Sequence, residues 1–366
     1  MNNTSNTTNE RPRVAVTFAA IDTYVEKHMI SPVETKGTGD RYKWGDLDKY
    51  PGYLLDLYDN VATLHSIIDG SVDFIAGDDV LFGGERDKVL NRWGETAPEI
   101  VRQLARNVNL FGGFAIEVIR SNEGGIAELY SIDLQYLRTN KENTVFWYSE
   151  KWDKGGRDAE EVPAFMPGAG TTPRSILFVK MDQMHIYPTP PYAAALKACE
   201  IERCIDDFHL NNLDNGFTSP AIISFNNGIP EDEEKNEITR GITEKYTGHQ
   251  NAGRPVVSFA DTKENAVTIE SLKTEDFGDR YQALAKRSQQ AIFTAFRCSP
   301  IIFGIVAESS LIGAEQNYED AYKLYNRTQV RPRQRKIADA FARIYGAPVL
   351  QITPFSLDGA SEAVVN

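Results

Sequence analysis

The sequence predicts an α+β protein in which a mixed first half is followed by a second half made chiefly of long helices. Residues 114–133 contain two runs in which apolar and polar residues alternate, the pattern of half-buried strands. Residues 192–216 and 275–298 instead carry sustained helical patterns. With 366 residues, 41% of them hydrophobic and 10% aromatic, the chain can bury a large core and has the composition of a folded protein.

The elements of the first half follow from their local patterns. Residues 1–50 begin with a polar segment that lacks the apolar stretch of a signal peptide, and residues 51–76 place apolar side chains at helical spacing. A helix is expected over 98–110, because Pro98 suits a first turn and Gly112-Gly113 provide a stop. Strands are expected at 114–120, 126–133, 144–150 and 175–188, with a Gly- and Pro-rich loop at 153–174.

The second half alternates long helices with a short insertion. Prolines at 188, 190 and 191 break the chain before a helix at 192–216, whose length is roughly 35 Å. A β-α-β unit is expected next, because two short apolar runs flank a helix that begins at a proline and ends at a glycine. Its parts are a strand at 220–225, the helix at 230–248, a strand at 254–259 and a further strand at 264–272.

The chain then returns to helix. A second long helix covers 275–298 and stops at Ser299-Pro300, and an apolar loop that contains glycine follows at 299–314. The last helix, 315–346, contains Pro332. It is expected to kink there, because proline lacks the backbone donor and clashes with the preceding turn.

The net charge of −13 restricts how this chain can meet nucleic acid. A conventional DNA-binding domain neutralises phosphates with Lys and Arg and is therefore basic. We expect any contact with DNA to be weak, non-specific and without base readout. No apolar run approaches the length of a membrane span, so a membrane partner is not expected.

The chemistry-bearing residues form no catalytic, cofactor or metal motif that we recognise in the sequence. The three cysteines, an odd and sparse set expected to be free and buried, are Cys199, Cys204 and Cys298. The five histidines, at 28, 65, 185, 209 and 249, lack mutual metal-ligand spacing. Phe82-Gly83-Gly84 lacks the Gly-Lys-Ser/Thr ending of a phosphate loop and is expected to be a turn. No Gly-x-Ser-x-Gly or HExxH motif occurs. We therefore predict no catalytic residue, no cofactor and no metal.

The order of elements between 191 and 346 resembles that of the tailed-bacteriophage portal protein family. The resemblance rests on a collinear series of segments, each weak alone: NNLDNGFTSPAIISF, GHQNAGRPVVSF, AIFTAFRCSPIIFGI and NYEDAYKLYNRTQVRPRQRKI. Upstream, VRQLARNVNLFGGFAIEVIRSNEGGIAELYSID resembles the helix, glycine and hairpin of the family's wing. The resemblance is strong over 191–346 and moderate over 51–190.

This resemblance implies a portal fold with a mixed α/β wing, two long stem helices that bracket a β-α-β clip, a tunnel loop and a kinked C-terminal helix. The implied division is an N-terminal arm and start of the wing at 1–50, wing at 51–190, first stem helix at 191–216, clip at 217–271, second stem helix at 272–298, tunnel loop at 299–314, kinked wing helix at 315–346 and C-terminal tail at 347–366. Little chain follows Gly346, so a crown is expected to be minimal or absent.

The resemblance also implies a function without enzymatic activity. Family members form a ring, commonly a dodecamer, at the portal vertex of the capsid in the virion, and double-stranded DNA is packaged and ejected through its channel. The implied partners are other copies of the chain, the large terminase, a head–tail adaptor, and the major capsid or scaffold protein, with assembly in the host cytoplasm. A ring of twelve would carry a formal charge of about −150, which repels phosphates and lets DNA slide.

Candidate DNA contacts lie in the expected tunnel loop and second stem helix. The loop positions are Gly304, Ile305, Val306, Ala307, Glu308, Ser309 and Ser310. An ordinary surface loop between helices is the alternative, which the apolar composition disfavours. Lys286 and Arg287 are expected to face either the channel or a neighbouring subunit.

Two further charged sets have competing interpretations. The acid run Glu231, Asp232, Glu233 and Glu234 is a candidate terminase-docking site, and a solvated helix start stabilised by the helix dipole is an equal alternative. The basic set consists of Arg327, Arg331, Arg333, Arg335 and Lys336. For this set we favour pairing with acidic groups, within or between subunits, over contact with DNA.

Two other functions compete with the portal interpretation. Another ring protein of the virion, such as a head–tail connector, is disfavoured because connectors are usually much shorter and lack two long helices around a clip. A phage nucleic-acid-processing enzyme would need clustered metal carboxylates or a phosphate loop, and we find neither in the sequence.

Overall fold

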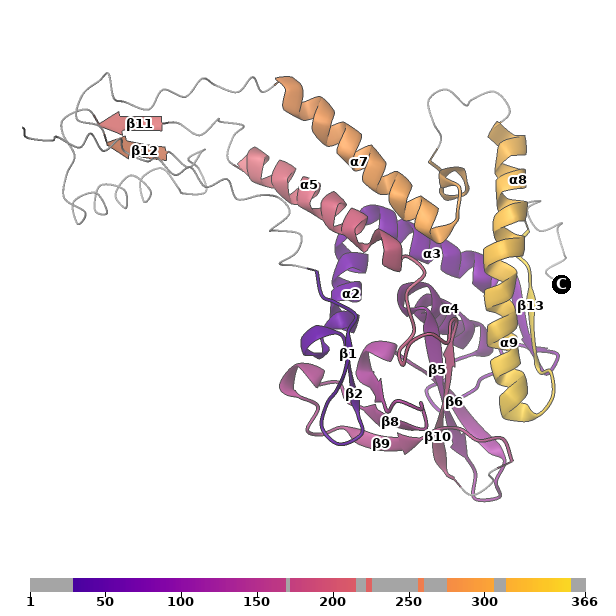
Figure 1. The fold of residues 1–366 in the computed structure, drawn as a ribbon. Helices are drawn as coiled ribbons and strands as arrows, with labels where there is room; N and C mark the ends of the chain where they lie inside the picture. The colour runs from indigo at the N-terminus through magenta and orange to yellow at the C-terminus, as the bar shows by residue number, and fades with distance from the viewer. Residues whose placement is uncertain are drawn as a thin grey trace, which may run out of the picture.

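A computed structural model describes residues 29–168, 172–214, 222–225, 256–259, 275–305 and 314–356. Its described helices and strands form a body of packed helices and small sheets from which one helix pair projects (Figure 1). This arrangement of a mixed body and long helices agrees with the predicted α+β class.

Three helices build the first layer: α2 (Tyr50–Asn60), α3 (Ala62–Ala76) and α4 (Ala97–Phe111). The helical pattern of 51–76 is thus divided, because Val61 adopts an extended conformation between α2 and α3. Thr96 and Glu99 form a capping box at the start of α4. Gly112 ends α4 with φ 84°, and a Cβ there would lie 1.9 Å from the carbonyl oxygen of Thr189, so glycine alone fits.

The main sheet has the order β10-β5-β6 and is antiparallel throughout. Its strands are β5 (Gly113–Arg120), β6 (Ile126–Ile132) and β10 (Arg174–Lys180). The hairpin expected around the SNEGG turn is confirmed. The strand expected at 175–188 ends early at Lys180, because Asp182 accepts a hydrogen bond from the backbone of Met184 and turns the chain.

A second small sheet contains a strand where a loop was expected. Its members are β7 (Leu137–Thr139), β8 (Val145–Tyr148) and β9 (Glu160–Pro163), in that order. Strand β9 lies inside the predicted loop 153–174, so that prediction is wrong there. The strand is short, polar at both glutamates and buried at Val162 alone, so it lacks the alternation that would reveal it in the sequence.

Two hairpins and the C-terminal strand complete the body. The first hairpin consists of β1 (Glu34–Lys36) and β2 (Tyr42–Trp44), and the second of β3 (Asp79–Phe82) and β4 (Glu85–Arg86). The turn predicted at Phe82-Gly83-Gly84 is confirmed, with both glycines at positive φ as a two-residue hairpin loop requires. Strand β13 (Leu350–Thr353) pairs with β3 and returns the C-terminal segment to the body.

The projecting pair consists of α5 (Leu196–Asp214) and α7 (Glu275–Phe296). The two helices lie side by side, and the ring of Phe208 stacks on that of Tyr281 at 4.7 Å (Figure 1). Strands β11 (Ile222–Phe225) and β12 (Val256–Phe259) pair in parallel, which agrees with the expected β-α-β order. The helix expected at 230–248 and the strand expected at 264–272 lie outside the described residues.

The last helical segment is interrupted before Pro332. It consists of α8 (Ala314–Tyr325), a π-helical turn (Asn326–Val330) and α9 (Arg331–Tyr345). Pro332 occupies the first turn of α9, where its missing N–H does least harm. A π turn at Asn326–Val330 thus interrupts the predicted helix just before Pro332, and a kink at Pro332 itself stays a prediction. Short 3-10 turns occur at Asp46–Asp48, Leu134–Tyr136, Trp152–Lys154, Ala193–Ala195 and Pro300–Phe303.

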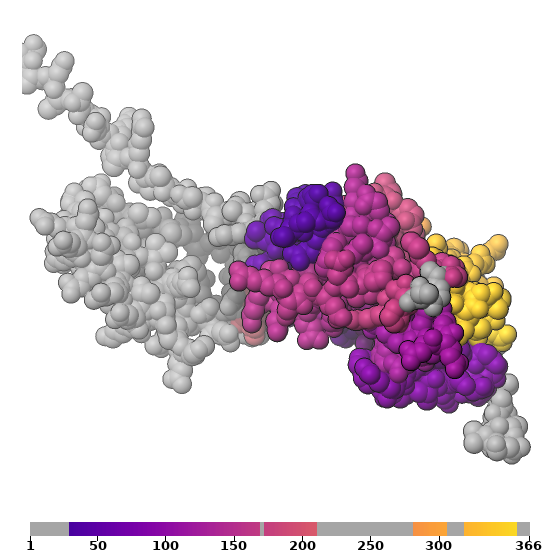
Figure 2. Space-filling model, turned by 90° about the horizontal axis from the view of Figure 1, so that it is seen from below, coloured from indigo at the N-terminus to yellow at the C-terminus, as the bar shows by residue number. Residues whose placement is uncertain are grey.

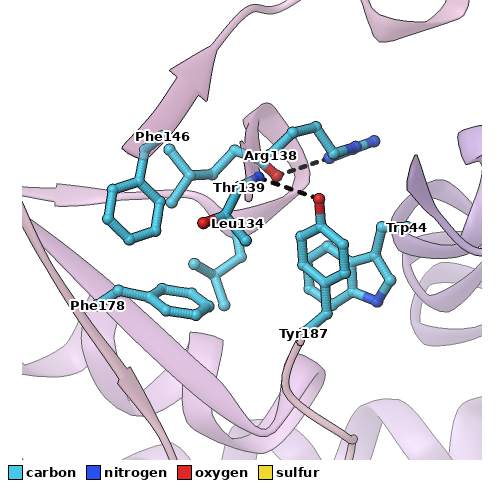
Figure 3. Close-up of a pocket in the computed structure, with 8 residues that line it drawn as sticks. Trp44, Leu134, Arg138, Thr139, Phe146, Phe178 and Tyr187 are labelled. Atoms are coloured by element: carbon cyan, nitrogen blue, oxygen red, sulfur yellow. Dashed lines mark hydrogen bonds between the residues drawn. The ribbon is translucent and has the colours of Figure 1, made fainter. Parts of the chain in front are cut away.

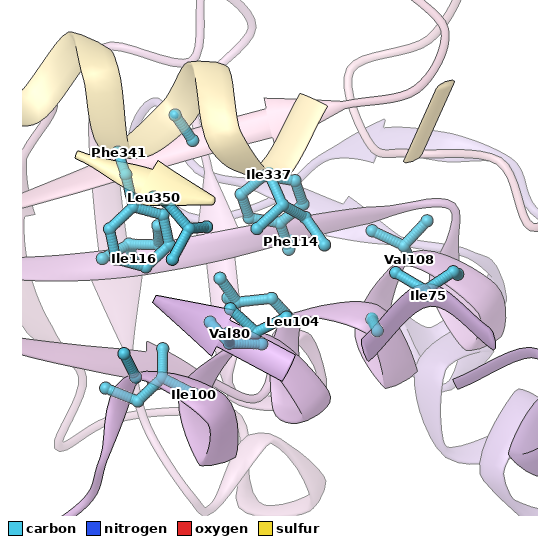
Figure 4. Packing of buried hydrophobic residues seen from close by; sticks show 14 of the residues in the cluster. Ile75, Val80, Ile100, Leu104, Val108, Phe114, Ile116, Ile337, Phe341 and Leu350 are labelled. Atoms are coloured by element: carbon cyan, nitrogen blue, oxygen red, sulfur yellow. The ribbon is translucent and has the colours of Figure 1, made fainter. Parts of the chain in front are cut away.

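Two hydrophobic clusters fill the body, and helix α3 contributes to both. Its first half buries Leu64, Ile67 and Ile68 in a cluster with α2 and α7. Its second half buries Val72 and Ile75 in a cluster with α4, β5 and α9, part of which is drawn in Figure 4. Seen from below, residues of the first half cover most of the described body, with the C-terminal helix (yellow) at one end (Figure 2).

Candidate functional site

The root of helix α5 is fixed by a buried polar cluster. Glu202 Oε1 accepts hydrogen bonds from the backbone N (3.2 Å) and Oγ1 (2.7 Å) of Thr63, at the start of α3. Arg203 contacts Asp56 of α2 at 2.5 Å and Glu200 at 2.7 Å. Because Glu200 and Glu202 are buried, these contacts tie α5 to both α2 and α3 at a defined depth.

The root of helix α7 is apolar and aromatic. Ile292, Phe293 and Phe296 are buried against the body. The ring of Phe296 stacks on Tyr192 at 5.3 Å, and the Tyr192 hydroxyl donates to the carbonyl oxygen of Leu110 at 3.0 Å. Both roots therefore pack in one hydrophobic cluster, and the root of α5 adds polar contacts through Glu202 and Arg203.

The segment that leaves α7 is anchored in the body before it reaches solvent. Arg297 takes a left-handed conformation (φ 54°) that ends the helix, and the Pro300–Phe303 turn follows. The ring of Phe303 lies 6.0 Å from Phe74, 6.1 Å from Phe293 and 6.2 Å from Tyr325. It fits against α3 at Gly70, where a Cβ would lie 2.7 Å from the ring.

This anchor divides the expected tunnel loop into two parts. Ile302 is buried and Phe303 half-buried, so these apolar residues pack on the chain's own core. The exposed part begins at Gly304, with φ 79°, and Ile305 is 48% exposed. The candidates Val306, Ala307, Glu308, Ser309 and Ser310 lie outside the described residues.

The other charged candidates differ in their surroundings. Lys286 and Arg287 are exposed on α7, and no ion pair involves either within the part of the chain that the structure describes. The acid run Glu231, Asp232, Glu233 and Glu234 falls outside the described residues.

The basic set is split between surface and interior. Arg327, Arg331, Arg335 and Lys336 are exposed. Arg333 is instead buried, and it donates to the backbone oxygen of Gln329 at 2.8 Å and to Gln329 Oε1 at 3.1 Å. Its burial lowers the pKa of the guanidinium. Arg333 thus braces the π turn and pairs with no carboxylate among the described residues.

The three cysteines are free, with Cys199 buried and both Cys204 and Cys298 half-buried. Burial raises the pKa of Cys199 and of Cys298 to about 12, and it also raises the pKa of Cys204, so all three thiols stay protonated at neutral pH. His65 lies 3.3 Å from Asp69 at the surface of α3. Within the described ranges, no three His, Cys, Asp or Glu side chains come together as a metal site.

An aromatic nest in the body is too tightly packed to bind a ligand. Its aromatic members are Trp44, Phe146, Phe178 and Tyr187, which Figure 3 draws. The side chains around them leave no space for a water molecule. Trp44 stacks on Tyr187 at 4.6 Å, and the backbone N–H of Thr139 donates to the Tyr187 hydroxyl at 3.1 Å. The nest joins the N-terminal hairpin to β7 and has a structural role.

The described geometry offers a projecting helix pair, close packing of both roots on the body, and an exposed start to the segment after α7 at Gly304 and Ile305. No described helix is both long and apolar enough to cross a membrane.

The contacts that hold Phe303 and the root of α5 in place could be predicted from the sequence only in part. Phe303 and Gly70 are separated by more than two hundred residues, and a lone glycine in a helical pattern indicates close packing without naming the partner. Glu202 and Thr63 carry no local signal of their pairing.

One family model matches most of the chain, and several solved structures share its fold. The family described as "Phage portal protein" matches residues 90–356. No protein with a curated description matches the sequence. A structure titled as an HK97 family phage portal protein from Corynebacterium diphtheriae is similar, with 12% identity, a TM-score of 0.52, and coverage of 86% of this chain and 97% of that one.

Structures of gene transfer agent particles are also similar. The neck of the native particle, computed with C12 symmetry, matches with 16% identity and a TM-score of 0.52, over 90% of this chain and 88% of that one. The virion of the native particle matches with 17% identity and a TM-score of 0.51, over 90% and 87%.

Replacing Gly70 tests the seat of Phe303. Gly70→Ala should lower the free energy of unfolding by about 1–2 kcal/mol, because the added methyl group displaces the Phe303 ring. Gly52→Ala is the matched control, since Gly52 is also helical but has no neighbour within 4 Å, and it should gain about 0.5–1 kcal/mol. Urea unfolding followed by circular dichroism measures both, and equal gains would contradict the contact.

The buried Glu202 should make stability depend on pH. Burial raises the pKa of this carboxyl above 4.5 in the folded chain, so the folded state favours the protonated form. The stability that the protonated Glu202 carboxyl contributes is complete below pH 4.5, and it is lost as the pH rises through the pKa of the folded state. Relative to wild type, Glu202→Gln should therefore gain stability between pH 4 and 7, measured by urea unfolding at each pH. A constant difference across that range would rule out this titration.

Proposed function

The chain belongs to the phage portal protein family, and on that premise we propose that it is one subunit of a twelve-membered ring at a capsid vertex. Double-stranded DNA enters the capsid and leaves it through the channel of this ring. The match over residues 90–356 carries the proposal, because it includes the helix pair, the segment after it and most of the body.

The described residues support a wall past which DNA slides. The projecting pair is long and narrow, and its roots are fixed in a rigid body by the Glu202–Thr63 contact and the Phe296–Tyr192 stack. Helices held at one end can stand side by side in a ring and line a central channel. The net charge of −13 per chain disfavours strong binding to phosphates, so the polymer is not trapped on its way through.

The segment at 299–314 is the proposed tunnel loop that narrows the channel. The contact of Phe303 with Phe293 at the root of α7, and the exposure of Gly304 and Ile305 directly after it, support this proposal. Channel-facing positions are proposed at Gly304, Ile305, Val306, Ala307, Glu308, Ser309 and Ser310. Contacts there would be non-specific, since the loop offers few donors for reading bases.

The protein partners follow from the family. We propose that residues 217–271 form the clip, and that this clip binds the large terminase during packaging and a head–tail adaptor afterwards. Glu231, Asp232, Glu233 and Glu234 are candidates for the terminase contact. The body is proposed to contact the major capsid or scaffold protein, with assembly in the host cytoplasm before the ring becomes part of the virion. The family is structural, and no hydrolysis of ATP or DNA by the purified protein is expected.

Measuring the mass of the assembled protein tests the ring directly. Twelve chains of 40.9 kDa give about 490 kDa, and native mass spectrometry should show this species. Negative-stain images should show a ring with a stalk narrower than its rim. A closed species of low copy number without an axial opening would overturn the proposed function.

Shortening the loop tests its role separately from assembly. Deleting residues 305–310 should leave rings of unchanged size, because the Phe303 anchor that precedes the deletion remains. DNA retention in packaged particles, measured by nuclease protection, should fall several-fold. If rings no longer form, the loop belongs to the contact between subunits instead.

A further inference from the structure

Four charged residues near the middle of the projecting helix pair have no ionic partner among the described residues of their own chain. Asp206 and Asp207 are exposed on α5, and Lys286 and Arg287 are exposed on α7. None of the four makes a hydrogen bond or ion pair within the described part of the chain. Exposed charges normally stay solvated, so exposure alone would give them no role.

Their placement on the two helices is opposite. Ile205 and Phe208 of α5 lie three residues apart on the face that meets α7, and the ring of Phe208 stacks on Tyr281. Residues 206 and 207, which lie between them, therefore turn away from α7. The pair of α5 and α7 forms a layer two helices wide. Asp206 and Asp207 lie on the side of this layer that α5 forms.

The same argument places the cations on the other side. Ala285 is half-buried and Ser288 is buried, again three residues apart on the face that meets α5. Lys286 and Arg287 lie between these positions and turn away from α5. The layer thus has an acidic side and a basic side, with the two helices between them.

The charged pairs lie at similar heights along the layer. The helices are antiparallel, with Phe208 opposite Tyr281, and both charged pairs lie on the root side of this contact. Their offset along the axis is about one helical turn, or roughly 5 Å. The long side chains of Lys and Arg can span such a distance.

We propose that these faces join neighbouring copies of the chain, with Asp206 and Asp207 of one copy paired with Lys286 and Arg287 of the next. A layer with opposite charges on its two sides cannot pair symmetrically with itself, because that would bring like charges together. It can repeat head to tail, and a head-to-tail contact closes into a ring when its rotation allows. The inference deepens the proposed portal ring and rests on it.

Charge reversal tests the pairing. D206K/D207K and K286E/R287E each place like charges at every contact. At the concentration at which wild type forms rings, each variant should stay unassembled, and its rings should need a roughly ten-fold or higher protein concentration. Combining all four substitutions in one chain restores opposite charges and should restore the ring. Native mass spectrometry measures the assembled fraction, and circular dichroism checks that each variant folds as wild type does.

Mixing the two reversed variants separates a contact between copies from a contact within one. One variant has acidic groups on both sides of the layer and the other has basic groups on both sides. An equimolar mixture should therefore form rings in which the two alternate in equal number, which mass spectrometry resolves. K154E/R157E is the matched control, because it changes the net charge as K286E/R287E does at exposed positions of the body, and it should assemble normally.

Three results would overturn the inference while leaving the proposed ring intact. Rings of both reversed variants with wild-type stability would show that the charges are not at the contact. Loss of rings without rescue by combination or mixing would show that the pairs do not meet. Normal rings of K286E/R287E with altered DNA retention would place Lys286 and Arg287 in the channel. If wild type itself forms no ring, the proposed function fails as well.

Discussion

The burial of helix α3 from two sides is the constraint on which the rest of the structure depends. Its residues Leu64, Ile67 and Ile68 are buried in the hydrophobic cluster that includes α7. Val72 and Ile75 are buried in the hydrophobic cluster that includes α9. A helix that is apolar on most of its circumference has to be covered over most of its surface, and α3 leaves only a narrow polar face with His65 and Asp73 exposed. The elements that cover α3 include α5 at Thr63, the Phe303 turn at Gly70 and the end of α8 at Ser71, where the Ser71 and Tyr325 hydroxyls lie 2.7 Å apart.

This arrangement links regions that are remote in the sequence. Because the α5 root, the start of the proposed tunnel loop and the C-terminal helix all rest on one helix, a shift in any of them is transmitted through close-packed side chains. The outer halves of α5 and α7 differ from their roots. Where their side chains are described, Phe208 stacks on Tyr281, and Asp206, Asp207 and Gln282 are exposed. Such a pair gains most from neighbours that cover it laterally.

The sequence was most informative where local patterns decide structure. Helix α4 and the β5–β6 hairpin follow from residues within about forty positions of each other, and both were predicted, whereas the capping box of α4 was recognised only in the structure. The predicted order of the long helices is also found in the structure, because their apolar residues keep helical spacing over many turns. Strand β9 was missed since its pairing with β8, and not its own composition, makes it a strand.

The candidate site was less accessible to prediction. The spacing of residues placed Lys286 and Arg287 on a long helix but could not say that the described part of their own chain leaves both unpaired. Arg333 appeared as one of five equivalent basic residues, yet it alone is buried. Its environment depends on the π turn, and a π turn has no reliable local signal, although Pro332 marked the neighbourhood.

The π turn also restricts which insertions and deletions the chain can accommodate. A π turn holds one residue more than an α-helical turn, so it is equivalent to a single-residue insertion in a continuous helix. Removing one residue from Asn326–Val330 would rotate all of α8 by about 100° relative to α9. Tyr322 and Tyr325 would then leave Phe74, and the segment before α8 would emerge in another direction. Among relatives, the number of residues between Phe303 and Pro332 should thus vary by whole helical repeats or through the loop, even where the amino acids themselves diverge.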